Sequence, residues 1–186
     1  TLVNALAGSK VSIVSHKAQT TRARLRAIAM ENEAQIVFVD TPGIFAPKRK
    51  LDEAMVESAW SGAGEADAVL LLVDGRRGLG GEVTAILEGL KTAKTGVILS
   101  INKIDLIKRE RLLEISAGLN AAFPFEATFM VSALTGSGLA DLRKYVAAKM
   151  PEGPWLYPED QVADVQLRFM ASEITREVIY ERLHDE

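Results

Sequence analysis

The stretch Ala34-Gln35-Ile36-Val37-Phe38-Val39, followed by Asp40-Thr41-Pro42-Gly43, decides the fold predicted for this chain. Its first six residues are mostly apolar, β-branched or aromatic, which is typical of a strand buried on both faces of a sheet. An acidic residue at the carboxyl end of such a strand lies where open α/β sheets bind ligands. The stretch therefore predicts an α/β protein with a ligand site just after this strand.

Helices and strands alternate on both sides of this stretch. Upstream, residues 1–8 are predicted to form a helix that Gly8 closes, and residues 24–31 an edge strand that turns back at 31–33. Downstream, helices are predicted at 51–61, 80–92, 107–121 and 138–149, and buried strands at 66–73, 95–101 and 127–131. This order indicates right-handed crossovers and a mostly parallel sheet with flanking helices.

Composition narrows the class of protein. The chain has 186 residues, of which 48% are hydrophobic, and this suits one domain with an appendage. A net charge of -3 predicts no bulk attraction to nucleic acid, so that RNA contact would need a local basic patch. The absence of cysteine excludes disulfides and thiolate metal sites, in keeping with a reducing cytosol.

The composition changes after residue 149. Residues 150–163 contain three prolines and are predicted to form a stiff linker. Residues 164–183 return to a helical pattern with one apolar stripe, and this helix is expected to open a second domain. We therefore predict a domain at 1–149, a linker at 150–163 and the start of another domain at 164–186.

Asn102-Lys103-Ile104-Asp105 follows one predicted strand, and Ser132-Ala133 follows the next. A carboxylate at Asp105 would accept hydrogen bonds from the two N–H donors of guanine, which adenine does not offer. Asn102 is expected to brace the loops around the base, Lys103 to cover it, and the Ala133 N–H to meet its oxygen. The alternative is an ordinary turn rich in Asn and Asp. Three polar strand ends in the right order favour the guanine site.

Asp40 is predicted to contact Mg²⁺ through a water, because Mg²⁺ keeps several waters near phosphates. The Gly43 N–H would then meet the γ-phosphate. A threonine in the polar loop at 12–23 is expected to join this site, with a segment that orders on binding triphosphate. Thr21 is the first choice and Thr20 the alternative, and spacing alone does not decide between them.

These motifs resemble those of a known class of enzyme. Asp40-Thr41-Pro42-Gly43, Asn102–Asp105 and Ser132-Ala133-Leu134 resemble nucleotide-binding motifs of translation-factor-type GTPases. Residues 11–22 resemble the first switch of the bacterial Era GTPases, and Tyr157–Gln161 with Arg168–Ile174 resembles their linker and the first helix of their RNA-binding KH domain. The resemblance covers essentially the whole chain.

The resemblance implies a P-loop NTPase (Ras-like) fold and a GTP-hydrolysing switch that uses GTP or GDP and Mg²⁺. It also implies binding to the 3′ end of 16S rRNA, a role in 30S ribosomal subunit assembly, and a cytoplasmic monomer with peripheral association to the inner membrane. Its site residues fall on Asp40, Thr41, Pro42, Gly43, Ile44, Asn102, Lys103, Ile104, Asp105, Ser132, Ala133 and Leu134 for the nucleotide, on Gln19, Thr20 and Thr21 for the first switch, and on Thr21 and Asp40 for the metal. Ile44 stands where Ras-like enzymes carry a water-orienting Gln, so slow intrinsic turnover is expected.

The sequence departs from the family in two places. It contains no Gly-x-x-x-x-Gly-Lys-Ser/Thr loop and no strand before that loop, so residues 1–186 alone are expected to be inactive. We expect the protein to continue N-terminally by on the order of 15 residues, and a gap of about 10 Å between the strands at 34–40 and 66–73. The Gly-x-x-Gly loop of KH domains is also absent. Two alternatives stay open: a related assembly or tRNA-modification GTPase, and a non-catalytic module that acts only as a partner.

Overall fold

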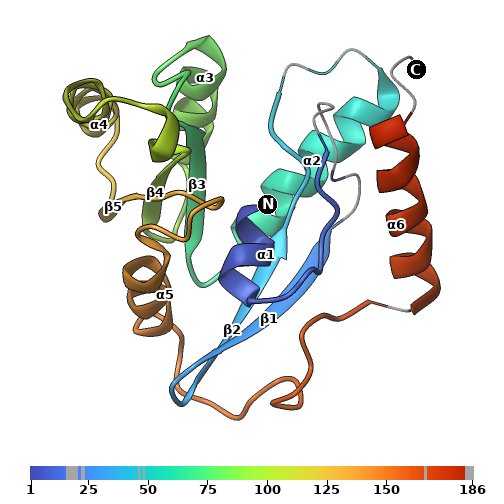
Figure 1. The fold of residues 1–186 in the computed structure, drawn as a ribbon. Coiled ribbons are helices and arrows are strands. Elements are labelled where there is room, and N and C mark those ends of the chain that lie inside the picture. The colour runs from blue at the N-terminus through green and yellow to red at the C-terminus, as the bar shows by residue number, and fades with distance from the viewer. Residues whose placement is uncertain (16–20, 22–23, 46, 48, 166, 183–186) are drawn as a thin grey trace.

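The computed structural model describes residues 1–15, 21, 24–45, 47, 49–165 and 167–182 (Figure 1). Its helices are α1 (Leu2–Ala7), α2 (Lys50–Glu65), α3 (Gly81–Leu90), α4 (Arg109–Ala122), α5 (Leu139–Ala147) and α6 (Leu167–Arg182), with a 3-10 turn at Ile104–Leu106. Its strands are β1 (Leu25–Glu31), β2 (Ala34–Asp40), β3 (Val69–Asp74), β4 (Val97–Asn102) and β5 (Ala127–Met130).

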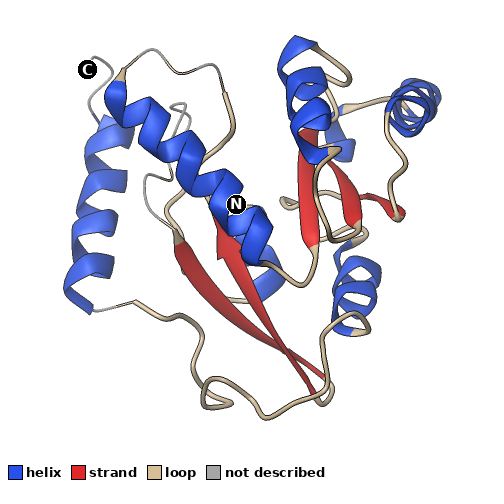
Figure 2. Ribbon diagram, turned by 180° about the vertical axis from the view of Figure 1, so that it is seen from behind, coloured by secondary structure: helices blue, strands red, loops and turns tan. Residues whose placement is uncertain are grey.

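The strands form two separate sheets, which stand apart in Figures 1 and 2. β1 and β2 make an antiparallel hairpin that pairs from Leu25 opposite Asp40 to Glu31 opposite Ala34. Asn32 makes the turn with a φ of 53°, in the left-handed region that Asn tolerates better than most residues. β3, β4 and β5 are parallel in that order, so the predicted parallel sheet is confirmed for three strands.

A cavity of about 790 Å³ lies between β2 and β3. Residues of both strands line it, together with residues of α1 and α2. Val39 and Leu72, near the carboxyl ends of β2 and β3, are 41% and 48% exposed. The prediction that both strands are buried on both faces is therefore wrong for the described part of the chain, because neither strand has a pairing partner on its side of the cavity. The cavity occupies the place where the gap was predicted.

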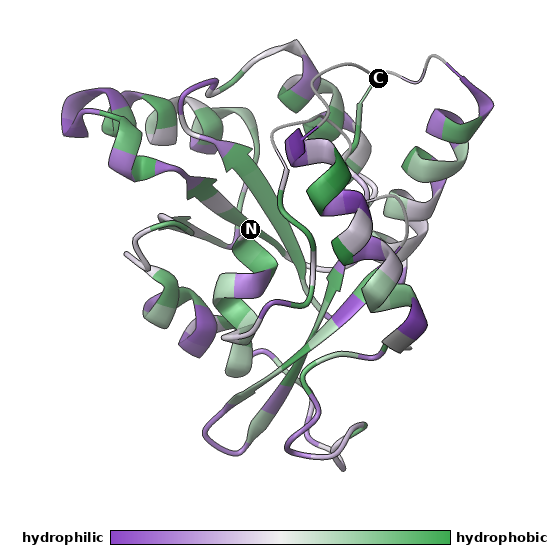
Figure 3. Cartoon of the chain, turned by 45° about the vertical axis from the view of Figure 1, so that its right-hand side comes forward, coloured by the Kyte–Doolittle hydropathy of each residue, from purple (hydrophilic) through white to green (hydrophobic). Residues whose placement is uncertain are grey.

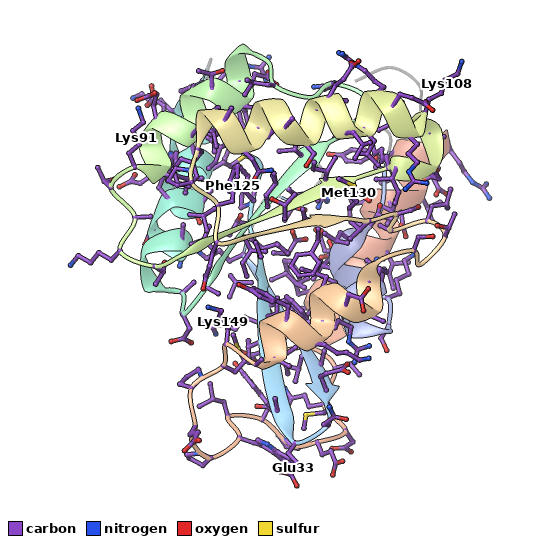
Figure 4. The ribbon with its side chains drawn as sticks, turned by 90° about the vertical axis from the view of Figure 1, so that its left-hand side faces the viewer. Glu33, Lys91, Lys108, Phe125, Met130 and Lys149 are labelled. Carbon is purple, nitrogen blue, oxygen red and sulfur yellow. The ribbon has the colours of Figure 1, made fainter. Side chains whose placement is uncertain are left out.

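β4 is the centre of the core, and all six of its residues are buried. One face of the parallel sheet packs against α4 through Leu112, Ile115 and Leu119, and Figure 4 shows Phe125 and Met130 beneath this helix. The other face packs against α1 and α5, with Leu6 and Leu142 nearly inaccessible. The hydropathy colouring of Figure 3 shows the same division, with apolar strands inside and polar helix faces outside.

α2 ends at Glu65, four residues beyond the predicted end. Arg24 holds the third turn of α2, because the Arg24 guanidinium donates to the Ser58 carbonyl from Nη2 (2.7 Å) and Nε (3.0 Å). A side chain at Gly62 would lie 3.3 Å from Thr41 Cγ2, so glycine lets the loop after β2 lie against the helix. Tertiary packing thus outweighs the low helix propensity of glycine here.

The linker lies along β1 instead of standing free. Ile28 N–H donates to the Val162 carbonyl (2.9 Å), and Asp164 N–H donates to the Arg26 carbonyl (3.1 Å). α6 follows, and its Phe169 packs against a small buried cluster around Val11. Within the residues that the structure describes, no helix has both the length and the apolar character needed to span a membrane.

Candidate functional site

The loops after β4 and β5 are joined by side-chain hydrogen bonds. Asn102 is 7% exposed, and its Oδ1 accepts from the Ala133 N–H at 3.0 Å. The Ser132 hydroxyl donates to Asp105 Oδ1 at 2.5 Å and accepts from the Thr135 N–H at 3.1 Å. The structure therefore brings Asn102, Asp105, Ser132 and Ala133 together, as the sequence predicted. The Ala133 N–H is engaged by Asn102, so its contact with a base oxygen stays a prediction.

Lys103 begins the turn between these strand ends with a φ of 66° and a ψ of 36°. This left-handed conformation is uncommon outside glycine, and it turns the chain so that the Ile104 N–H reaches the Val131 carbonyl at 3.3 Å. Asp105 is exposed, and Leu134 is 81% exposed. The predicted selectivity of Asp105 for guanine therefore depends on burial of its carboxylate by the bound base.

Asp40 lies at the carboxyl end of β2 and accepts two hydroxyl hydrogen bonds. Its Oδ2 receives Ser12 Oγ at 3.0 Å and Thr21 Oγ1 at 3.3 Å. Burial raises the pKa of the Asp40 carboxyl above its usual range, and the two hydroxyls offset part of that rise. A small hollow of about 150 Å³ opens beside these three side chains, and Leu72 of β3 also lines it. Thr21 therefore lies beside Asp40, the other residue of the predicted metal site, while Thr20 and Gln19 lie outside the described residues.

Ser12 also contacts Asp40, and it is absent from the site residues predicted from the sequence. Asn4 of α1 fixes its position, because Asn4 Oδ1 accepts from the N–H groups of Val11 (2.9 Å) and Ser12 (2.8 Å) and its amide donates to the Ser12 carbonyl (2.7 Å). The only signal was that Ser12 stands within the stretch that resembles a switch. Nothing local distinguishes it from the other hydroxyl residues there.

The donor set around Asp40 suits Mg²⁺. A carboxylate and two hydroxyls are hard oxygen ligands, and Mg²⁺ is held by few protein groups with waters and phosphates in the other positions. Within the described ranges no three His, Cys, Asp or Glu side chains gather as a complete metal cage. Asp40, Thr21 and Ser12 therefore fit a metal that is bound partly by another ligand.

The turn after Asp40 faces the cavity between β2 and β3. Thr41, Pro42, Gly43 and Ile44 all line it, with Pro42 buried and Gly43 exposed. A side chain at Gly43 would meet nothing within 4 Å. The protein's own packing therefore does not require glycine at this position, and the predicted approach of a phosphate supplies a reason for it.

The sequence of this chain is similar to the sequences of known proteins. Residues 1–103 match the profile of the family described as 50S ribosome-binding GTPase. GTPase Era of Mesorhizobium japonicum is 60% identical over all 186 residues, and that of Agrobacterium fabrum is 59% identical. This chain spans about 60% of the length of these curated relatives.

Solved structures give the same result. A variant of Aquifex aeolicus Era bound to GDP and AlF4⁻ superposes with a TM-score of 0.93 at 38% identity, over 100% of this chain and 64% of that one. Era in complex with MgGDPNP and nucleotides 1506–1542 of 16S ribosomal RNA superposes with a TM-score of 0.89 at 40% identity, over 95% of this chain and 60% of that one. These matches confirm the resemblance predicted from the motifs.

Proposed function

Because this chain belongs to the family of 50S ribosome-binding GTPases, we propose that it binds GTP and GDP and forms part of a GTP-hydrolysing switch of the Era type. The observation that carries the proposal is the pair of loops closed by Asn102–Ala133 and Ser132–Asp105. Asp105 accepts the two N–H donors of guanine, and Ser132 holds the carboxylate in place. Adenine offers neither donor, and a site built to pair such donors rejects a base that lacks them.

The phosphate end of the nucleotide lies at Asp40 in this proposal. Asp40, Thr21 and Ser12 supply oxygen ligands for Mg²⁺, which when bound neutralises charge that develops on the phosphates. The Gly43 N–H donates to the γ-phosphate, while Gln19 and Thr20 complete the first switch. Ile44 offers no hydrogen bond to the attacking water, so hydrolysis without a partner is slow.

A strand supplied from outside residues 1–186 fills the cavity between β2 and β3. Both strands face it with unpaired edges, and apolar side chains of α1 and α2 line it. Adjacent strands lie about 4.8 Å apart, so that one strand spans a gap of about 10 Å. The loop after that strand would bring phosphate-binding N–H groups and a lysine toward Asp40.

The remaining assignments follow the Era relatives. We propose that residues 1–149 belong to the GTPase domain, residues 150–163 link it, and residues 164–186 begin an RNA-binding KH domain. The structure of one relative contains a fragment of 16S ribosomal RNA. By analogy this protein binds the 3′ end of 16S rRNA and assists 30S assembly in the cytoplasm; the monomeric state and the peripheral membrane contact stay predictions.

Nucleotide competition on the full-length protein tests the guanine site. GTP and GDP should displace a fluorescent GDP analogue and ATP should not, while Asp105→Asn should move the preference toward xanthine nucleotides. Asp141→Asn, which changes an exposed acid at the start of α5, is the matched control and should keep the guanine preference. Equal competition by ATP would overturn the guanine assignment. Specific binding of guanine nucleotides without any GTP hydrolysis would favour the non-catalytic module instead.

A further inference from the structure

We propose that Asp74, at the end of β3, is a positioning residue of the guanine site. Its carboxylate holds the ammonium group of Lys103 and so sets the Lys103 stem where it covers a bound base. This inference deepens the proposed function and rests on it. It concerns a residue outside the motifs that the sequence singled out, and on a different strand from Lys103.

The ends of β3 and β4 are joined at this point. Asp74 pairs with Asn102 in the parallel register, and the Gly75 N–H donates to the Asn102 carbonyl at 2.9 Å. A side chain at Gly75 would lie 3.1 Å from that carbonyl oxygen and closer still to Ile107 Cδ1. The turn after β3 is therefore fixed against the first residue of the Asn102–Asp105 motif.

The Asp74 carboxylate is shared between two cations. Oδ2 accepts from Lys103 Nζ at 2.9 Å, and the Arg76 side chain donates to Oδ1 and Oδ2 at 3.2 and 2.9 Å. The Arg76 N–H adds a third contact from this residue at 3.0 Å. The Asp74 side chain is 19% exposed, against 45% for that of Lys103. The hydrogen bonds from Arg76 lower the pKa of the Asp74 carboxyl far below its usual range, with Lys103 adding to the effect.

Both ends of the Lys103 side chain are therefore fixed. The left-handed backbone conformation sets the direction of the Lys103 Cα–Cβ bond. The ion pair with Asp74 holds the Nζ atom at the other end of the side chain. A free lysine loses rotamer entropy when it is ordered. Fixing the stem before the base arrives reduces that loss, which is how preorganisation raises affinity. The effect should appear mainly in the dissociation rate, as most affinity differences within one interface do.

The test measures release of a fluorescent GDP analogue from the full-length protein. Asp74→Asn keeps the shape but removes the charge, and we expect release about threefold to tenfold faster, the range for a partly exposed charge-assisted hydrogen bond. Glu82→Gln is the matched control. It removes an acid from the start of α3 that pairs with Arg77 and is 69% exposed, so it leaves the Lys103 contact intact.

A double-mutant cycle separates positioning from a merely structural role. If Asp74 acts through the Lys103 ammonium, Asp74→Asn should have no further effect in a Lys103→Met background, because methionine lacks that group. An equal effect of Asp74→Asn in both backgrounds would overturn the proposal. Slower release of the nucleotide from Asp74→Asn would also overturn it, because the ion pair would then compete with the nucleotide. Failure of the unmodified protein to bind GDP would instead refute the proposed function.

Discussion

Glu177 of α6 lies 2.5 Å from the Lys10 ammonium, although 167 positions separate the two residues. The same carboxylate accepts the Val14 N–H at 2.9 Å, and its side chain is 7% exposed. Residues 10–14 are therefore held from two sides, by Asn4 of α1 and by Glu177 of α6. The helix assigned to the second domain thus contacts the segment that carries Ser12.

Glu177→Ala should loosen this contact. It leaves the Val14 N–H without its charged acceptor, a loss of roughly 1.5–3 kcal/mol for a hydrogen bond to a charged group. Amide exchange at Val14 should accelerate by on the order of tenfold to a hundredfold. Glu181→Ala, at an exposed position on the same helix, is the control and should leave exchange unchanged. Unaltered exchange at Val14 in the Glu177 variant would show that α6 does not hold the segment.

Acid should release the same contact. Burial alone would raise the pKa of the Glu177 carboxyl, but hydrogen bonds from Lys10 and the Val14 N–H bring it below the ordinary 4.5. A lowered folded pKa gives stabilisation that is complete above the unfolded pKa and is lost as the pH falls through the folded pKa. Exchange at Val14, corrected for intrinsic rates, should therefore rise only below pH 4.5, and should lose this dependence in Glu177→Gln.

Asp40→Asn should separate stability from metal binding. The pKa of the Asp40 carboxyl in the parent protein is raised above 3.8, so the folded state binds the proton more tightly than the unfolded state does. The stability of the parent therefore falls as the pH rises from 3.8 through the folded-state pKa. Without Mg²⁺ the variant should be as stable as the parent or more so, and should lose this pH dependence. Retention of nucleotide should require on the order of tenfold more Mg²⁺. Urea unfolding and Mg²⁺ titration measure the two effects. Unchanged Mg²⁺ dependence would argue against Asp40 as a metal ligand.

Gln35 should govern the docking of the linker. Its Oε1 accepts from the N–H groups of Leu156 (2.9 Å) and Tyr157 (3.0 Å), and its Nε2 donates to the Tyr157 carbonyl (2.8 Å). Gln35→Ala should expose the linker to protease and speed amide exchange at Tyr157. The loss of these hydrogen bonds should lower the free energy of unfolding by roughly 1–3 kcal/mol. Glu33→Ala is the matched control, because Trp155 donates to the Glu33 backbone carbonyl, which the substitution keeps, and Figure 4 shows Glu33 at the hairpin tip. Equal behaviour of the two variants would remove Gln35 from this role.

The proposed strand between β2 and β3 can be tested with two leucines. Leu72 lines the cavity and is 48% exposed, while Leu113 on α4 is 55% exposed. If a strand fills the cavity of the full-length protein, Leu72→Ala loses buried contacts and should cost about 2–5 kcal/mol. Leu113→Ala should stay within about 0.5 kcal/mol, as surface substitutions do. Equal small losses in denaturant unfolding would mean that the cavity stays open to water.

Local sequence predicted the elements whose signals are themselves local. Gly8 ends α1 in the left-handed conformation, and Asn32 turns the hairpin, as their residue types indicate. α2 runs four residues past its predicted end at 61, through Gly62 and Gly64, because Arg24 and Thr41 contact that part of the helix from outside it. The exposure of β2 and β3 is not predictable for a related reason. An apolar run of residues does not indicate whether both edges of a strand pair with neighbouring strands.

The sequence by itself determined the order of strands and helices, the polar strand ends at 40, 102 and 132, and the position of the gap, because periodicity and short motifs are properties of neighbouring residues. Only the tertiary structure decided which side chains meet across the chain: Asp74 with Lys103, Gln35 with the linker, and Glu177 with Lys10 and Val14. These partners are separated by 29 to 167 positions. No local pattern encodes such pairs, because the packing of whole elements brings them together.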